Sequence, residues 1–270
     1  MSPLRFGCHD FLNAQPLLQN LKKRTSALNF TIQTGTPGEL ADRLQAGELD
    51  LAMIPSYEYL KQVKSYRLLS GVCIASRGEV ESVFLVTQNA DLKQIKTVAV
   101  DCRSRTSVAV LKILFGDRFA SDWSLRPADP DLESMLLENS AALIIGDPAL
   151  ELDRSSPYTR YDLSQEWFRR TGKSFVHAVV AIREGVVIPK EISNSIQSAA
   201  QKDAGLLEII CRQYAELDET KFVQCQNYLT DKISYHLGAD EIEGLTQFQK
   251  MCETIDEGIS QQDFIWENEE

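Results

Sequence analysis

Four groups of polar residues each follow an apolar segment that has the length of a β-strand. The groups are residues 9–13, 56–58, 104–107 and 146–147. Ser, Thr, Asn and Asp in such places commonly act only as helix caps, because the first backbone N–H groups of a helix have no partner within it. Those N–H groups, at the positive end of the helix dipole, can also receive a carboxylate. Four groups together favour a site for a small carboxylate-bearing molecule.

Charged side chains accompany these groups, and each has two interpretations. Arg103 and Arg105 flank one of the caps, where they can offer paired donors to a carboxylate or form a solvated loop. The same ambiguity applies to Arg77. Glu58 falls at the third position of a helix that starts at Ser56, where the helix dipole alone favours an acid.

The three histidines have different surroundings in the sequence. His9 follows the first predicted strand and can serve as a proton carrier or as a polar loop residue, because the unperturbed pKa of histidine is about 6.5. His177 lies within an apolar strand and is predicted to be a core or hinge residue. His236 falls in the C-terminal helical region, and nothing around it points to chemistry.

Composition and missing motifs exclude several classes of protein. The 270 residues carry a formal net charge of -11, so the average surface would repel a nucleic acid. The sequence shows neither a secretory leader nor an apolar run of about 18 residues, which predicts a cytoplasmic protein without membrane contact. Six cysteines without paired spacings favour reduced thiols over zinc ligands. Nucleotide-binding glycine motifs are also missing, so no metal or cofactor is predicted.

Alternating strands and helices are predicted along most of the chain. Strands are expected at residues 4–8, 29–34, 49–54, 72–75, 82–87, 97–100, 141–145 and 176–182. Helices are expected at residues 36–46, 108–115, 131–138, 163–171, 191–214, 221–229 and 240–255, with shorter ones after residues 55 and 146. Asn13 is predicted to be the N-cap of the first helix, with Pro16 in its first turn.

The restart of the pattern after residue 88 predicts two lobes. The chain is expected to cross between them near residues 87 and 176. Residues 1–87 and 177–270 then form a discontinuous first domain, which includes the C-terminal helices, and residues 88–176 form the second. The alternation favours mostly parallel sheets. Because such folds bind ligands beyond the carboxyl ends of their strands, the site is expected in a central cleft between the lobes.

Several phrases, in a fixed order, resemble the chorismate dehydratase family. They are residues 11–17 (FLNAQPL), 47–58 (GELDLAMIPSYE), 82–86 (SVFLV), 101–108 (DCRSRTSV), 142–147 (ALIIGD), 161–167 (YDLSQEW) and 233–238 (ISYHLG). The resemblance extends from about residue 4 to residue 255. It implies an α/β, two-lobed, type II periplasmic-binding-protein-like fold, used by an enzyme of the futalosine route to menaquinone. The chain departs from the family pattern at Val180, where tryptophan is expected, and at His236, where an acid is expected.

The resemblance implies a lyase that eliminates water from chorismate. Loss of the ring C4 hydroxyl and the C3 proton gives 3-[(1-carboxyvinyl)oxy]benzoate, and aromatisation drives the reaction without cofactor or metal. The predicted catalytic residues are Asn13, Glu58 and Asp147. The predicted substrate-binding residues are Ser56, Ser82, Val83, Ser104, Thr106, Ser107 and Gly146. The base stays open among Glu58, Asp147, His9 and a substrate carboxylate.

Two other functions remain open at this point. The same fold commonly serves non-catalytic receptors, which here would be a cytoplasmic small-carboxylate binding protein. The sister branch of the family is a 1,4-dihydroxy-6-naphthoate synthase, and residues 11–17 favour the dehydratase because the sister branch opens with a different segment. Chorismate is the only partner implied, and the sequence does not define the oligomeric state.

Overall fold

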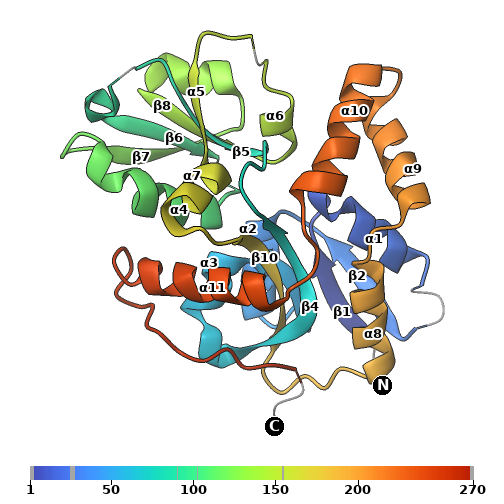
Figure 1. The fold of residues 1–270 in the computed structure, drawn as a ribbon. Coiled ribbons are helices and arrows are strands. Elements are labelled where there is room, and N and C mark those ends of the chain that lie inside the picture. Colours follow the sequence, from blue (N-terminus) through green and yellow to red (C-terminus); the bar gives the residue numbers. More distant parts are fainter. Residues whose placement is uncertain (1–2, 25–27, 90, 102, 154, 268–270) are drawn as a thin grey trace.

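The structure is a computed structural model that describes residues 3–24, 28–89, 91–101, 103–153 and 155–267. Its described elements form two α/β lobes, each built around a five-stranded sheet (Figure 1). The two-lobed arrangement agrees with the predicted fold class.

The sheet of the first lobe has the strand order β2-β1-β3-β10-β4. Its strands are β1 (Leu4–Cys8), β2 (Phe30–Thr34), β3 (Leu51–Pro55), β4 (Tyr66–Ser76) and β10 (Phe175–Arg183). Helices α1 (Gln15–Lys22), α2 (Pro37–Gln45) and α3 (Ser56–Lys61) follow β1, β2 and β3 in turn. These three strands pair in parallel, and β10 runs antiparallel to β3 and β4. Every residue of β3 is buried, which explains its uniformly apolar sequence.

The sheet of the second lobe has the order β7-β6-β8-β5-β9. Its strands are β5 (Val83–Thr87), β6 (Thr97–Asp101), β7 (Ser124–Ala128), β8 (Ala141–Ile145) and β9 (Thr159–Asp162). Its helices are α4 (Thr106–Phe115), α5 (Leu132–Glu138), α6 (Asp147–Leu150) and α7 (Leu163–Thr171). The two edge strands β7 and β9 were not predicted, because β7 is largely exposed and contains Pro127, and β9 has only four residues.

The two crossings between the lobes make both sheets mixed, not mostly parallel as predicted. β4 leads through residues 77–82 into β5, and α7 leads through residues 172–174 into β10. Because β5 and β10 arrive from the other lobe, each runs antiparallel to its neighbours.

The first crossing also leads into β5, which joins the second sheet. The prediction placed residues 83–87 in the first domain, yet β5 pairs with β8 and β9 of the second sheet. An apolar strand pattern does not reveal which sheet the strand joins. The division of the chain into two separate domains stays a prediction.

The C-terminal part adds helices α8 (Lys190–Ala199), α9 (Ala204–Ala215), α10 (Glu219–Asn227) and α11 (Ala239–Cys252). The single helix predicted at residues 191–214 is wrong, because the Asp203 side chain accepts the Leu206 N–H at 3.1 Å and so caps a new helix. A π-helical turn, Tyr228–Lys232, ends α10. The chain then lies beside β4, where Ala75 and Ser234 exchange both backbone hydrogen bonds. This return brings residue 233 to the space between the lobes.

The described cysteines agree with the prediction of reduced thiols. Cys8, Cys73, Cys211, Cys225 and Cys252 are buried and free, and Cys102 lies outside the described residues. Within the described ranges, no three His, Cys, Asp or Glu side chains gather where they could ligate a metal ion. No helix in those ranges combines the length and the apolar character that crossing a membrane requires.

Candidate functional site

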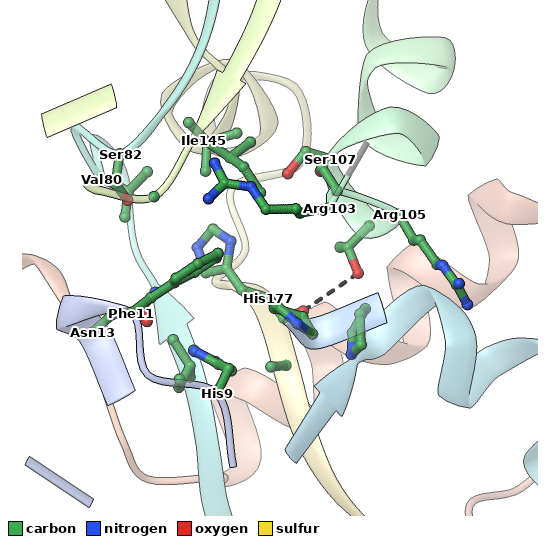
Figure 2. A pocket seen from close by; sticks show the side chains of 18 of the residues that line it. His9, Phe11, Asn13, Val80, Ser82, Arg103, Arg105, Ser107, Ile145 and His177 are labelled. Carbon is green, nitrogen blue, oxygen red and sulfur yellow. Dashed lines mark hydrogen bonds between the residues drawn. The ribbon is translucent and has the colours of Figure 1, made fainter. Parts of the chain in front are cut away.

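A cavity lies between the two lobes, beyond the carboxyl ends of β1, β3, β6 and β8. This is a common position for small-molecule sites in such folds. Figure 2 shows the side chains of His9, Asn13, Arg103 and His177 around this space. The apolar part of the wall comes from Phe11, Pro37, Pro55, Ile74, Val80, Ile145, Ala178 and Ile233.

Seven of the ten predicted site residues line this cavity. They are Asn13, Ser82, Val83, Ser104, Thr106, Ser107 and Gly146. Ser56, Glu58 and Asp147 are not among the described residues of its wall. The structure therefore brings most of the predicted residues together and assigns different contacts to three of them.

Those three residues contact other parts of the fold. Ser56 Oγ donates to the Val176 carbonyl oxygen at 2.6 Å and so binds the start of α3 to β10. Glu58 is 3.3 Å from the Arg105 guanidinium and 3.6 Å from Lys61 Nζ. A carboxylate so paired neutralises cations and does not face the cavity.

Asp147 links the second lobe to the first. Its Oδ1 accepts the Leu12 N–H at 3.0 Å. Burial raises the pKa of Asp147, while that hydrogen bond and the nearby Arg103 act in the opposite direction. The hydrogen bond anchors the turn after β1 to the start of α6.

Side chains therefore already bind two of the helix-start amides that were expected to receive a ligand. Asp147 takes the Leu12 amide, and Thr106 Oγ1 accepts the Tyr57 N–H at 3.2 Å. Arg105 adds a paired contact with Asp42, at 2.8 and 2.7 Å. These contacts join the two lobes across the cavity. The starts of α3 and α6 thus contribute contacts between the two lobes.

The start of α4 has the strongest features of an anion site. No described side chain caps this ten-residue helix, and Ser104, Thr106 and Ser107 line the cavity beside its first amides. Arg103 lies next to them. Its guanidinium donates to both Asp101 carboxylate oxygens, at 2.8 and 2.6 Å, and stacks 5.2 Å from the centre of the Phe11 ring. The helix dipole and this oriented cation favour a negative group there.

The sequence predicted Asn13 as the N-cap of the first helix, and this prediction is wrong. The N-cap of α1 is Ala14, and Asn13 lies in a 3-10 turn, Leu12–Ala14, that the Leu12–Asp147 hydrogen bond anchors. The Asn13 side chain lines the cavity instead (Figure 2). Its Oδ1 is buried and has no hydrogen-bond partner among the described residues. An orphaned acceptor of this kind in a cavity wall is suited to a ligand donor.

Two histidines line the cavity, and burial lowers the pKa of each to about 4. His9 is 3% exposed, and its Nδ1 has no partner within the described part of the chain. His177 lies in strand β10, as predicted, and its Nε2 lies 2.7 Å from Ser76 Oγ. Both imidazoles are therefore neutral at pH 7.

Acid is expected to destabilise the protein through these two histidines. Their pKa is about 4 in the folded state and about 6.5 when unfolded, so the unfolded chain binds protons more tightly between those values. The free energy of unfolding should keep its full value above about pH 6.5 and should decrease as the pH falls below that value. From pH 7 to pH 5, the loss is about 2 kcal/mol for each histidine. Urea unfolding at a series of pH values measures it.

The control for this effect is a variant with His9→Gln and His177→Gln together. Its free energy of unfolding should change less steeply than that of the wild type between pH 7 and pH 5, because the two groups no longer titrate. Equal slopes in the two proteins would contradict the assignment.

Two residues that sequence reasoning considered lie elsewhere. Arg77 is exposed and pairs with Asp240 at 3.2 Å. His236 lies with Arg77 in a separate surface hollow. Val180, where the family pattern has tryptophan, is fully buried in β10. It does not belong to the described cavity wall.

Tyr228 is a residue that sequence reasoning missed. It lies in the π-helical turn and is 2% exposed, and its hydroxyl donates to Ser82 Oγ at 2.9 Å. The two residues are far apart in the sequence. No local pattern signals such a contact; only the return of the chain along β4 creates it.

Comparison with known proteins places the chain in a family. A sequence model of the family described as menaquinone biosynthesis matches residues 4–254. The chain belongs to this family. A chorismate dehydratase of Thermus thermophilus is 31% identical over 265 residues, which cover 92% of this chain and 94% of that protein. The predicted family is thereby confirmed.

Solved structures resemble the fold of this family member. Protein AF1704 of Archaeoglobus fulgidus has a TM-score of 0.74 at 16% identity, over 94% of this chain and 98% of that one. The alkanesulfonate-binding protein SsuA of Xanthomonas axonopodis has a TM-score of 0.63 at 14% identity, over 98% and 96%. The Candida albicans CA3427 gene product, described with the generic periplasmic binding protein fold, has a TM-score of 0.61 at 10% identity, over 97% and 92%. These likenesses confirm the predicted fold class.

Proposed function

We propose that this protein is a chorismate dehydratase and acts in the cytoplasm on the futalosine route to menaquinone. The observation that carries the proposal is the cavity of a menaquinone-biosynthesis family member, lined from both lobes by polar groups suited to a dicarboxylate. Its relative of 31% identity is named for this activity.

The proposed reaction removes one molecule of water from the ring. The C3–H bond and the C4–O bond break, and the C3–H electron pair becomes part of the aromatic ring of 3-[(1-carboxyvinyl)oxy]benzoate. The proton passes to a base, and the C4 hydroxyl leaves with its electron pair and is protonated to water. Since aromatisation supplies the driving force, the protein mainly orients the substrate and stabilises the charges that develop.

The start of α4 is the proposed site of a substrate carboxylate. Its uncapped amides, the hydroxyls of Thr106 and Ser107, and the cation of Arg103 all support this role. Across the cavity, Ser82 and Asn13 are proposed to bind the other substrate oxygens. The overall negative charge of the protein opposes an anionic ligand, and these local donors offset it at short range.

The contacts of the candidate residues support fewer groups as the base than the sequence alone allowed. Glu58 pairs with Arg105, and Asp147 accepts the Leu12 amide. These contacts argue against either carboxylate as the base. His9 lines the cavity and is neutral, and a carboxylate of the substrate is the other group that can lie there. We therefore keep His9 and the substrate carboxylate as the two candidates.

Incubation of the purified protein with chorismate alone tests the proposal. Chromatography and ultraviolet absorbance should show chorismate replaced by 3-[(1-carboxyvinyl)oxy]benzoate. Tight binding without conversion would instead identify a small-carboxylate binding protein. Neither binding nor conversion would favour the sister 1,4-dihydroxy-6-naphthoate synthase.

A further inference from the structure

Tyr228 connects the C-terminal helices to the cavity wall. Its hydroxyl donates to Ser82 Oγ at 2.9 Å. Ser82 lies in the segment that enters β5 and lines the cavity. One buried phenol thus contacts a residue of the cavity wall that is far away in the sequence.

The direction of this hydrogen bond determines what Ser82 can offer a ligand. A tyrosine hydroxyl has a single hydrogen, which here goes to Ser82. Ser82, whose oxygen accepts from the phenol, keeps its own hydrogen for another acceptor. In the same cavity wall, Asn13 Oδ1 is buried without a partner among the described residues.

We propose that Tyr228 is a positioning residue that makes Ser82 a hydrogen-bond donor toward the ligand, in the same cavity wall as the unpartnered acceptor Asn13 Oδ1. The site then selects a molecule with an acceptor oxygen beside Ser82 and a hydroxyl group beside Asn13. This inference rests on the proposed function for its substrate, because chorismate carries both carboxylate oxygens and a ring hydroxyl.

Neighbouring tyrosines provide an internal comparison. The hydroxyls of Tyr214 and Tyr235 are buried like that of Tyr228, yet neither has a hydrogen-bond partner among the described residues. Tyr228 also lies in a π-helical turn, a feature that often occurs at functional sites. Tyr235→Phe is therefore a matched control that removes a buried phenolic oxygen without touching the cavity wall.

A double-mutant cycle with chorismate tests the connection to Ser82. Tyr228→Phe should lower kcat/KM about tenfold in the wild-type background, as expected for a lost orienting hydrogen bond. In the Ser82→Ala background it should lower kcat/KM less than about twofold, since the residue it positions is gone. Tyr235→Phe should stay within about twofold of the wild type. A full tenfold loss from Tyr228→Phe in both backgrounds would overturn the proposal.

A second measurement needs neither ligand nor turnover. In a ¹H spectrum, the hydroxyl proton of Tyr228 is assigned by its loss in Tyr228→Phe. Its exchange with water should be at least about tenfold faster in Ser82→Ala than in the wild type or in Tyr235→Phe, because the hydroxyl loses its acceptor. Unchanged exchange would overturn the proposal even in an active enzyme. Absence of chorismate conversion by the wild type would reject only the proposed function.

Discussion

Replacing Asn13 with alanine is expected to lower kcat/KM for chorismate by about 100- to 1,000-fold, the usual effect of removing one oriented polar group from an active site. The same change should leave the free energy of unfolding within about 1 kcal/mol of the wild type. The reason is that Asn13 Oδ1 is buried without a described partner, so its removal relieves a polar group that folding leaves unbonded. Steady-state kinetics and urea unfolding measure the two effects separately.

Asn139→Ala is the control for Asn13→Ala. Asn139 Oδ1 is also buried without a partner among the described residues, and its amide donates to the Met135 carbonyl oxygen at 2.9 Å, away from the cavity wall. Its loss should leave turnover unchanged. Turnover of Asn13→Ala within about threefold of the wild type would remove Asn13 from the proposed site. A large loss of stability would mean that the drop in activity reflects unfolding.

Elements with strong local signals were predicted closely. The bounds predicted for α7, residues 163–171, are those of the structure. The Asp162 side chain accepts the N–H groups of Ser164 and Gln165 at the start of this helix, and Gly172 ends it in the left-handed conformation. The strand at residues 141–145 was equally clear, because all five residues are buried and apolar.

Features that depend on distant contacts were not predictable. Glu58 and Asp147 follow strands in the same way as the residues that line the cavity. They differ from those residues in their distant partners, since Glu58 pairs with Arg105 and Asp147 accepts the Leu12 amide. Which sheet receives β5 depends on a crossing, and the role of Tyr228 depends on the return of the chain after α10. In each case the deciding neighbour lies far away in the sequence.

Gly244→Ala is expected to lower the free energy of unfolding by about 3 kcal/mol, near the upper end of the usual cost of overpacking. Gly244 lies in α11, and a methyl group there would overlap the backbone carbonyl oxygen of Ser174. That oxygen already accepts the Trp167 Nε1–H at 3.2 Å, and Phe248 of α11 packs against the Trp167 ring. Neither the helix nor the carbonyl can therefore shift without disrupting buried contacts.

The matched control is Gly205→Ala, which also replaces a helical glycine. Gly205 is exposed in α9, and its nearest outside atom, Asp203 Oδ1, would lie 3.4 Å from the new methyl group. Alanine there should raise the free energy of unfolding by about 0.5–1 kcal/mol, because glycine loses more conformational entropy in a helix. Chemical unfolding of both variants would distinguish steric overlap from the general effect of replacing glycine.

The Gly244 variant also tests whether α11 affects the cavity. Ser174 directly precedes β10, which carries His177 and Ala178 into the cavity wall. If Gly244→Ala forces the start of this strand to move, the folded variant should lose turnover as well as stability. Wild-type stability in Gly244→Ala would mean that α11 can move away from Ser174 at little cost. The close approach of helix and strand would then be a consequence of the fold, with no part in stabilising the strand that lines the site.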